Sequence, residues 1–220
     1  MNDRIQRLIV AAHAGDIYPK QVKVDYDAFD EKLSDPQRIA KRLTEYMSAQ
    51  PCAFSDDNEL VGMIRFDGSV EGPLFPRIGH RFFYEAAGKY YRHPQENLCT
   101  FEWQHSNADF GKVIRIGLVG LRAEIVGARR QYESDMKRLE FLAGLESMIR
   151  GIVNRSHQYA AECRRRAVDP ATPPKRRAAL LRMAANCERV PEHPAQTFEE
   201  AVQCLYFCFQ FQPDSIGRPD

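Results

Sequence analysis

Residues 101–109 hold the densest group of side chains that could take part in acid–base chemistry. The segment reads Phe-Glu-Trp-Gln-His-Ser-Asn-Ala-Asp and combines the only Trp of the chain with one His and two carboxylates. Its residues 106–109 end at Asp109 and are a capping signal for an expected helix. An imidazole at a helix start meets the positive end of the helix dipole, which disfavours imidazolium. His105 could therefore exchange a proton with a bound hydroxyl group. It could equally be a hydrogen-bonded residue of an ordinary capped loop, and the residue types leave both interpretations open.

The remaining His and Cys residues give little support for a metal site. None of the six His is paired with another His or with a Cys at the spacing that places two ligands on one helical face. Cys204 and Cys208 do have that spacing, but their segment is apolar throughout and favours core thiols. The six Cys are widely spaced in a chain of this size, so we expect reduced thiols. Phosphate-loop, dinucleotide-binding and hydrolase motifs do not occur, and we expect no metal.

Seven basic residues gather around a Pro-rich break at residues 169–174. They could contact an acidic partner or nucleic acid, or they could form a solvated helix end balanced by Glu162 and Asp169. The second interpretation is favoured, because 31 Lys and Arg face 30 Asp and Glu and leave a formal net charge of only +1. We therefore expect no nucleic-acid partner. The seven residues are Arg164, Arg165, Arg166, Lys175, Arg176, Arg177 and Arg182.

The composition is that of a folded chain without a membrane segment. With 220 residues, 44% of them hydrophobic, the chain can bury a substantial core, which excludes a disordered tail. Crossing a bilayer takes about 18 consecutive apolar residues, and no run approaches that length. The first residues also lack the apolar stretch of a secretory signal, so we expect a cytoplasmic protein.

Apolar periodicity predicts a mainly α-helical fold. A helix of roughly 50 Å is expected near residues 132–166, which implies a scaffold larger than a compact bundle. Asp35 is the expected N-cap of an earlier helix, and a turn at residues 56–58 precedes residues 59–66, which could form a strand or one buried helical turn. The expected helices cover about residues 2–14, 36–50, 82–90, 110–125, 132–166, 175–188 and 197–211.

The last of these helices has the clearest start. Thr197 and Glu200 form a capping-box pattern. The helix is apolar almost all round, so we expect it to be buried on every side and to need a covering surface from elsewhere. The expected inward stripe is Phe198, Ala201, Val202, Leu205 and Phe209.

Several stretches resemble the N-terminal region of glycyl-radical enzymes, the pyruvate formate-lyase family. Residues 186–207 and 215–220 match the family patterns C-x-x-V-P, P-A-x-T-F-x-E-A and S-x-G-R-x-D. Residues 105–120 are similar to G-H-x-x-x-D-Y-x-K-V-L-x-x-G-x-x-G, and residues 57–62 to a segment ending in I-V-G. The resemblance covers most of this chain but only the front part of a family chain several times longer.

The resemblance implies a fold and a chemistry. The expected fold is the helical N-terminal portion of the family's α/β barrel, with the barrel itself largely missing. Residues 1–220 would form one such part, with entry helices and loops in 1–106 and a long-helix segment in 107–220. Family members are lyases, dehydratases or formate acetyltransferases of anaerobic metabolism, in which a C-terminal glycyl radical generates a cysteine thiyl that abstracts a hydrogen atom from a small organic substrate.

This sequence contains neither of the two radical motifs. No Cys has the context G-C-[VI]-E, and no R-V-[AS]-G-Y loop is present. We therefore expect no catalytic residue within this chain. The implied partners are the small-molecule substrate, an S-adenosylmethionine-dependent iron–sulfur enzyme that installs the glycyl radical, and a second copy in a homodimer. The alternative is a stand-alone helical binding or scaffold protein derived from the family.

The resemblance also selects site residues. In members that dehydrate diols, the His of the G-H motif lies at the substrate pocket, so His105 becomes the expected substrate contact. Gln104 replaces the usual Gly and would add an amide near that pocket. Gln212 and Pro213 stand where the diol branch often has His and Ser, which weakens the interpretation as a plain diol dehydratase.

The final family motif is expected to be structural. Arg218 would be a buried donor with two parallel N–H groups, and Gly217 would supply a permissive backbone. Ser215 and Asp220 complete the motif match.

Overall fold

The computed structural model describes residues 2–14, 32–62 and 109–210. Within these ranges the regular secondary structure is helical and contains no β-strand, which confirms the mainly helical prediction. None of these helices is both long enough and apolar enough to cross a membrane. The helices are α1 (Asp3–Ala14), α2 (Asp35–Ala49), α5 (Phe110–Gln131), α6 (Met136–Ala167), α7 (Pro174–Arg189) and α8 (Phe198–Gln210).

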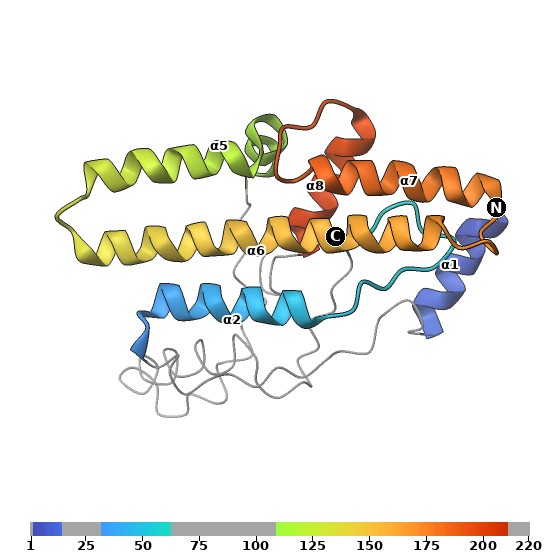
Figure 1. Ribbon diagram of the computed structural model, residues 1–220, viewed down its shortest axis with the longest axis horizontal. Coiled ribbons are helices and arrows are strands. Elements are labelled where there is room, and N and C mark those ends of the chain that lie inside the picture. Colours follow the sequence, from blue (N-terminus) through green and yellow to red (C-terminus); the bar gives the residue numbers. More distant parts are fainter. Residues whose placement is uncertain (1, 15–31, 63–108, 211–220) are drawn as a thin grey trace.

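The long helix α6 is the axis of the molecule. Figure 1 shows α5 and α7 along one side of α6 and α2 along the other. Its 32 residues span roughly 48 Å, so the predicted long helix is confirmed. It begins a few residues later than predicted, because the carboxylate of Asp135 caps it by accepting a hydrogen bond from the Arg138 amide at 3.1 Å.

Two glycines let α2 approach α6 closely. Gly144 and Gly151 are seven residues apart and therefore lie on the same face of α6. A Cβ at Gly144 would come within 2.8 Å of the Pro36 carbonyl oxygen, and one at Gly151 within 2.6 Å of the Thr44 hydroxyl oxygen. The absence of side chains at these two positions sets the distance between the helices.

The ends of α2 and the chain beyond it agree closely with the sequence. The N-cap is Ser34 rather than Asp35, one residue earlier than predicted, because Gln37 accepts a hydrogen bond from the Ser34 amide at 3.3 Å and forms a capping box. The helix ends at the predicted place, and the predicted turn at residues 56–58 is present. Residues 59–62 are neither strand nor helix, whereas residues 63–66 and the predicted helix at 82–90 lie outside the described residues.

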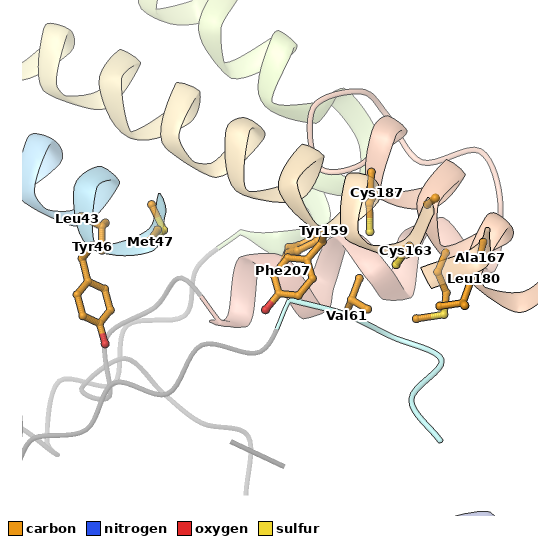
Figure 2. Close-up of a cluster of buried hydrophobic side chains, with 13 residues drawn as sticks. Leu43, Tyr46, Met47, Val61, Tyr159, Cys163, Ala167, Leu180, Cys187 and Phe207 are labelled. Carbon is orange, nitrogen blue, oxygen red and sulfur yellow. The ribbon is translucent and has the colours of Figure 1, made fainter. Parts of the chain in front are cut away.

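The apolar core lies where α2, α6, α7 and α8 converge (Figure 2). The Tyr159 and Phe207 rings pack at its centre with their centroids 6.1 Å apart. Burial of such side chains supplies most of the stabilisation of a helical body. The cluster consists of Leu43, Tyr46, Met47, Val61, Tyr159, Ala160, Cys163, Ala167, Leu180, Met183, Ala184, Cys187 and Phe207.

The start of α8 is as predicted, but its inward face is different. The Glu200 amide donates to the Thr197 hydroxyl at 3.1 Å, which confirms the cap. The predicted inward stripe is wrong for two of its members, because Phe198 is 83% exposed and Leu205 is 40% exposed. Among residues 198–208, whose burial the structure describes, the fully buried ones are Gln203, Cys204 and Phe207.

The helix therefore turns a polar residue toward the core. Gln203 is buried because its side-chain amide pairs with the backbone of Val61, and this pairing rotates the helix away from the purely apolar arrangement. The expectation that α8 is buried on all sides is not met by the described chain, since one edge of the helix faces outward.

Candidate functional site

The predicted site residues lie outside the described part of the chain. Gln104 and His105 fall within residues 63–108, and Ser215, Gly217, Arg218 and Asp220 follow residue 210. Their roles stay predictions. The structure does describe the chain on either side of residues 63–108. The preceding segment ends at Gly62, and the following one starts at Asp109, directly before α5.

Asp109 lies at the N-terminal end of α5, whose positive dipole end was expected to disfavour the charged form of His105. Its carboxylate accepts a hydrogen bond from the Lys112 amide at 2.8 Å, which confirms the predicted cap. A carboxylate at this position is stabilised by the helix dipole and partly compensates its positive end. A basic group near the start of α5 would therefore meet a negative side chain as well as the dipole.

A sharp break divides α5 into two helical halves at Gly117. Its backbone has φ 65° and ψ 174°, in the left-handed region that favours glycine. The break frees two amides that cannot bond within the helix. The Leu118 amide donates to the Pro191 carbonyl at 2.9 Å, and the Val119 amide donates to the Glu192 carbonyl at 3.0 Å. Backbone carbonyls thus cap the second half of α5.

The carbonyls belong to a segment that we call the proline loop, residues 190–195. It includes a cis peptide bond between Val190 and Pro191. The Ala195 amide donates back to the Ile114 carbonyl on the other side of the break, at 3.0 Å. A Cβ at Gly117 would lie 2.5 Å from the Glu192 carbonyl oxygen, so only glycine fits against this loop. This break in α5 was not predicted from the sequence, although Gly117 lies at a glycine of the family pattern.

Side chains connect the proline loop to the neighbouring helices. Arg189 donates to the Pro194 carbonyl at 3.1 Å and lies 3.4 Å from a carboxylate oxygen of Glu200. On α6, the His157 Nε2 atom lies 3.3 Å from Glu192. The proline loop therefore contacts α5 and α6 directly and is joined to α8 through Arg189 of α7. Its hydrogen bonds on both sides of the break hold the two halves of α5 together.

Residues 50–62, which we call the strap, run along α6 and α7 without forming regular secondary structure. An isolated extended segment must find partners for its backbone groups, and arginine side chains supply several of them. Arg155 donates to the carbonyls of residues 50 and 51 at 2.6 and 2.9 Å. Arg166 donates to the carbonyl of residue 54 at 2.7 Å, and Arg176 to those of residues 55 and 58 at 3.1 and 2.7 Å.

The strap ends against α8. The Val61 amide donates to Gln203 Oε1 at 3.2 Å, and Gln203 Nε2 donates to the Val61 carbonyl at 2.6 Å. The next residue, Gly62, has φ 122° and lies so close to the Phe207 ring that a Cβ would approach two ring carbons to 2.6 Å. The point at which the chain enters residues 63–108 is therefore fixed by α8. Gln203, a polar residue within the apolar stretch of this helix, was the sequence signal that could have revealed this contact.

The basic residues around the Pro-rich break are largely compensated. Arg164 pairs with Glu188 at 2.8 Å between Nε and Oε1, and Arg165 and Arg166 both pair with Glu162. Hydrogen bonds from Arg165 hold the pKa of Glu162 below its ordinary value, although partial burial opposes the shift. This network supports the interpretation as a balanced helix end rather than a surface for polyanions.

The described thiols are structural. All five are free, and three of them, Cys163, Cys187 and Cys204, are fully buried. Burial raises the pKa of Cys163 to about 12, and it raises that of Cys187 even more clearly. The hydrogen bond between the Cys204 and Cys208 thiols lowers the pKa of Cys204 and raises that of Cys208. Among residues 2–14, 32–62 and 109–210, no group of three or more His, Cys, Asp or Glu could hold a metal ion.

Three solved structures share this fold over nearly the whole chain. The glycerol-bound, B12-independent glycerol dehydratase from Clostridium butyricum superposes with a TM-score of 0.73 at 18% identity, covering 96% of this chain and 34% of that one. A structure of 1,2-propanediol dehydration in Roseburia inulinivorans gives 0.68 at 19% identity, covering 96% and 32%. A glycyl radical enzyme from Archaeoglobus fulgidus gives 0.64 at 17% identity, covering 94% and 34%.

Curated relatives match about half of the chain. The probable dehydratase YbiW of Escherichia coli (strain K12) is 31% identical over 107 residues, which cover 47% of this chain and 13% of the relative. Isethionate sulfite-lyase of Bilophila wadsworthia is 30% identical over 117 residues, which cover 51% and 14%. The chain thus spans about one seventh of these relatives' length by sequence, and about one third of the solved structures' length by fold.

The family comparison agrees with the solved structures and with the curated relatives. The family description "Pyruvate formate lyase-like" matches residues 100–212, a little over half of the chain, and this range contains the broken helix α5, the proline loop and α8. The chain belongs to the pyruvate formate lyase-like family of glycyl radical enzymes.

Proposed function

We propose that this chain forms the N-terminal helical part of a glycyl-radical lyase or dehydratase that acts on a small hydroxylated substrate. The family match supports the enzyme class. The similar proteins are named for glycerol, 1,2-propanediol and isethionate, which are two- or three-carbon compounds with a hydroxyl group and a second polar group on the adjacent carbon. We propose a substrate of this class, cleaved at a C–O, C–S or C–C bond.

The observation that carries the proposal is the junction at Gly117. Two separate stretches that resemble the family, residues 105–120 and 186–207, pack against each other there through backbone hydrogen bonds. In this arrangement α5 and the proline loop form one rigid support, and the chain entering α5 is the chain that carries His105. Positioning of a substrate contact to within a fraction of an ångström depends on such a support.

In the proposed enzyme this chain contributes substrate contacts and not the radical. His105 would exchange a hydrogen bond or proton with a substrate hydroxyl group, and Gln104 would add an amide to the same pocket. The thiyl and glycyl radicals would be supplied by the barrel, and an S-adenosylmethionine-dependent iron–sulfur enzyme would install the glycyl radical. We further propose a cytoplasmic, oxygen-free setting and a homodimeric complete enzyme.

The outward edge of α8 supports this division. Phe198 and Leu205 are exposed and lie seven residues apart, and therefore on one side of the helix. An exposed aromatic and an exposed aliphatic side chain in the family's own motif are suited to burial against the barrel.

The test is substitution of His105 in the complete enzyme, activated under anaerobic conditions. We expect His105→Ala to lower turnover of the hydroxylated substrate by at least a hundredfold, which is the typical contribution of a positioned acid–base group. The glycyl radical signal in electron paramagnetic resonance should keep its intensity. His193→Ala is the matched control, since this imidazole is exposed on the proline loop. Unchanged turnover in His105→Ala would remove His105 from the site.

The second candidate function is a stand-alone helical scaffold. It is favoured by one observation: the core between α2, α6, α7 and α8 is closed, with Met47, Tyr159 and Phe207 fully buried. The isolated 220-residue chain decides between the two. A sharp cooperative melting transition without binding of an apolar dye supports the scaffold, whereas a broad transition with dye binding supports the role as part of a larger enzyme.

A further inference from the structure

Side chains of α6, α7 and α8 bind the main chain of the strap, and its carboxylates Asp57 and Glu59 pair separately with Arg7 and Arg4 of α1. Five hydrogen bonds from Arg155, Arg166 and Arg176 reach the main-chain carbonyl oxygens of residues 50, 51, 54, 55 and 58, at 2.6 to 3.1 Å. The side-chain amide of Gln203 then pairs with both backbone groups of a sixth residue. Recognition of this kind is typical of surfaces that bind extended polypeptides, where main-chain hydrogen bonds supply affinity and a few pockets supply specificity.

Two of the three arginines are oriented by their own helix. Arg166 Nε donates to Glu162 at 2.8 Å, one turn earlier on α6. Arg155 donates to Gln158 at 3.1 Å and to the Tyr159 hydroxyl at 3.3 Å, both on α6. Because these contacts do not involve the strap, the donors are positioned before an extended chain arrives. A prepositioned donor loses less conformational entropy on binding.

The chemistry of the bound group follows from Arg155. Its side chain is only 1% exposed, and it donates to four neutral oxygen atoms of carbonyl, amide and hydroxyl groups. A buried guanidinium requires hydrogen-bond acceptors in place of water. The strap supplies two carbonyl dipoles to it, so any replacement for the strap must also present main-chain carbonyls.

The surface that α6 and α8 present to the strap favours particular strap side chains at two places. The guanidinium carbon of Arg166 lies 3.9 Å from the centroid of the Phe54 ring. Val61 is 1% exposed within the core, and Gly62 lies against the Phe207 ring where no side chain fits. The recognised pattern is therefore an aromatic residue followed, seven positions later, by a branched apolar residue and glycine.

From these contacts we propose that α6, α7 and α8 form a binding groove for an extended polypeptide, and that residues 50–62 are its resident ligand. The groove is preformed and accepts the same segment when it is supplied as a separate peptide. This inference goes beyond the proposed function and does not depend on it, because every residue that carries it belongs to the described helical body.

The experiment releases the strap and supplies it in trans. In the full chain, Val61→Asp places a carboxylate in the core and should expel the strap, and Gly62→Ala should do so by collision with Phe207. The probe is a fluorescein-labelled synthetic peptide of residues 50–62 with Cys52→Ser. We expect saturable binding to either variant, measured by fluorescence anisotropy, and at least tenfold weaker binding when Arg176→Leu is added to the same variant. Amide hydrogen exchange reports release of the strap and protection of α6 and α7.

Control peptides separate backbone recognition from nonspecific association. A peptide with Asp56→Ala loses only an 88% exposed carboxylate 3.8 Å from Arg176 Nε, so its affinity should fall by less than about fivefold. A peptide with Val61→Asp should bind at least tenfold more weakly. Absence of saturable binding to a variant with a released strap and protected helices overturns the proposal. It is also overturned if both variants lose protection of α6 and α7, because the groove is then not preformed. If both variants retain the strap, the proposal fails as well, because the groove then does not select valine and glycine at these two positions.

Discussion

Gln203 and Val61 lie 142 positions apart in the sequence and form a closed pair of hydrogen bonds. The side-chain amide of Gln203 accepts from the Val61 N–H and donates to the Val61 C=O. Both residues are 1% exposed, so neither backbone group can turn to water if the amide is lost. This contact joins α8 to the strap and places the start of residues 63–108.

Replacing the Gln203 amide should destabilise the fold, because the buried backbone groups of Val61 lose their hydrogen-bond partner. Gln203→Leu keeps the approximate volume but leaves two buried backbone groups of Val61 unpaired, and we expect a loss of about 2–4 kcal/mol in the free energy of unfolding. Urea denaturation measures it. Gln196→Leu, at an exposed position, is the control and should change stability by less than about 0.5 kcal/mol. Equal effects of the two substitutions would contradict the burial of this pair.

The break in α5 makes two glycines of one helix respond in opposite directions to the same substitution. Gly117→Ala puts a Cβ 2.5 Å from a carbonyl oxygen at a residue with φ 65°, so we expect a loss of more than about 2 kcal/mol. Gly127→Ala meets no atom within 4 Å and should stabilise the chain by about 0.5–1 kcal/mol through helix propensity. Thermal and chemical denaturation of both variants give the comparison. A continuous helix would produce the same sign at both positions.

The close approach of α2 and α6 predicts a compensating pair of substitutions. Gly151→Ala should destabilise the chain by about 1–3 kcal/mol, because the new methyl group overlaps the side chain of Thr44. Thr44→Ala removes the two overlapping atoms, so the double variant should recover part of the loss. A double-mutant cycle measures the coupling, which we expect to be at least about 0.5 kcal/mol. Strictly additive effects would show that the two helices are farther apart.

Alkaline pH should weaken the fold through a buried thiol. Burial raises the pKa of Cys163 from 9.0 to about 12, so the folded state holds this proton more tightly than the unfolded state. Its stabilising contribution is complete below pH 9 and is lost as the pH rises from about 9 to about 12, at up to ~1.4 kcal/mol per pH unit. Unfolding free energies measured between pH 8 and pH 11 should fall more steeply in the wild type than in Cys163→Ala. Parallel curves would contradict the burial of this thiol.

Helix boundaries and caps could be predicted from the sequence because they depend on local chemistry. Asp109, Thr197 and the chain break before α7 act within one turn of their own positions. The inward face of α8 could not be predicted in this way, because it depends on a contact with Val61 far away in the sequence.

The same reason explains what was missed at the candidate site. A glycine in a helical pattern looks like a tolerated substitution, and only the proline loop lying against Gly117 reveals why a side chain is excluded there. Arg155 likewise carries no local sequence signal, because its burial depends on carbonyls contributed by the strap. Compensation of the basic cluster by Glu162 could be predicted, since this carboxylate lies within one helical turn of Arg165 and Arg166, whereas the partner of Arg164, Glu188, lies on the next helix.

The long separation between Val61 and Gln203 has a consequence during synthesis on the ribosome. The strap emerges well before α8 is translated, and the backbone of Val61 has no side-chain amide to pair with until Gln203 has left the exit tunnel. The nascent chain can therefore assemble α2 and α6 early, but the strap and α8 pair only when α8 has been translated.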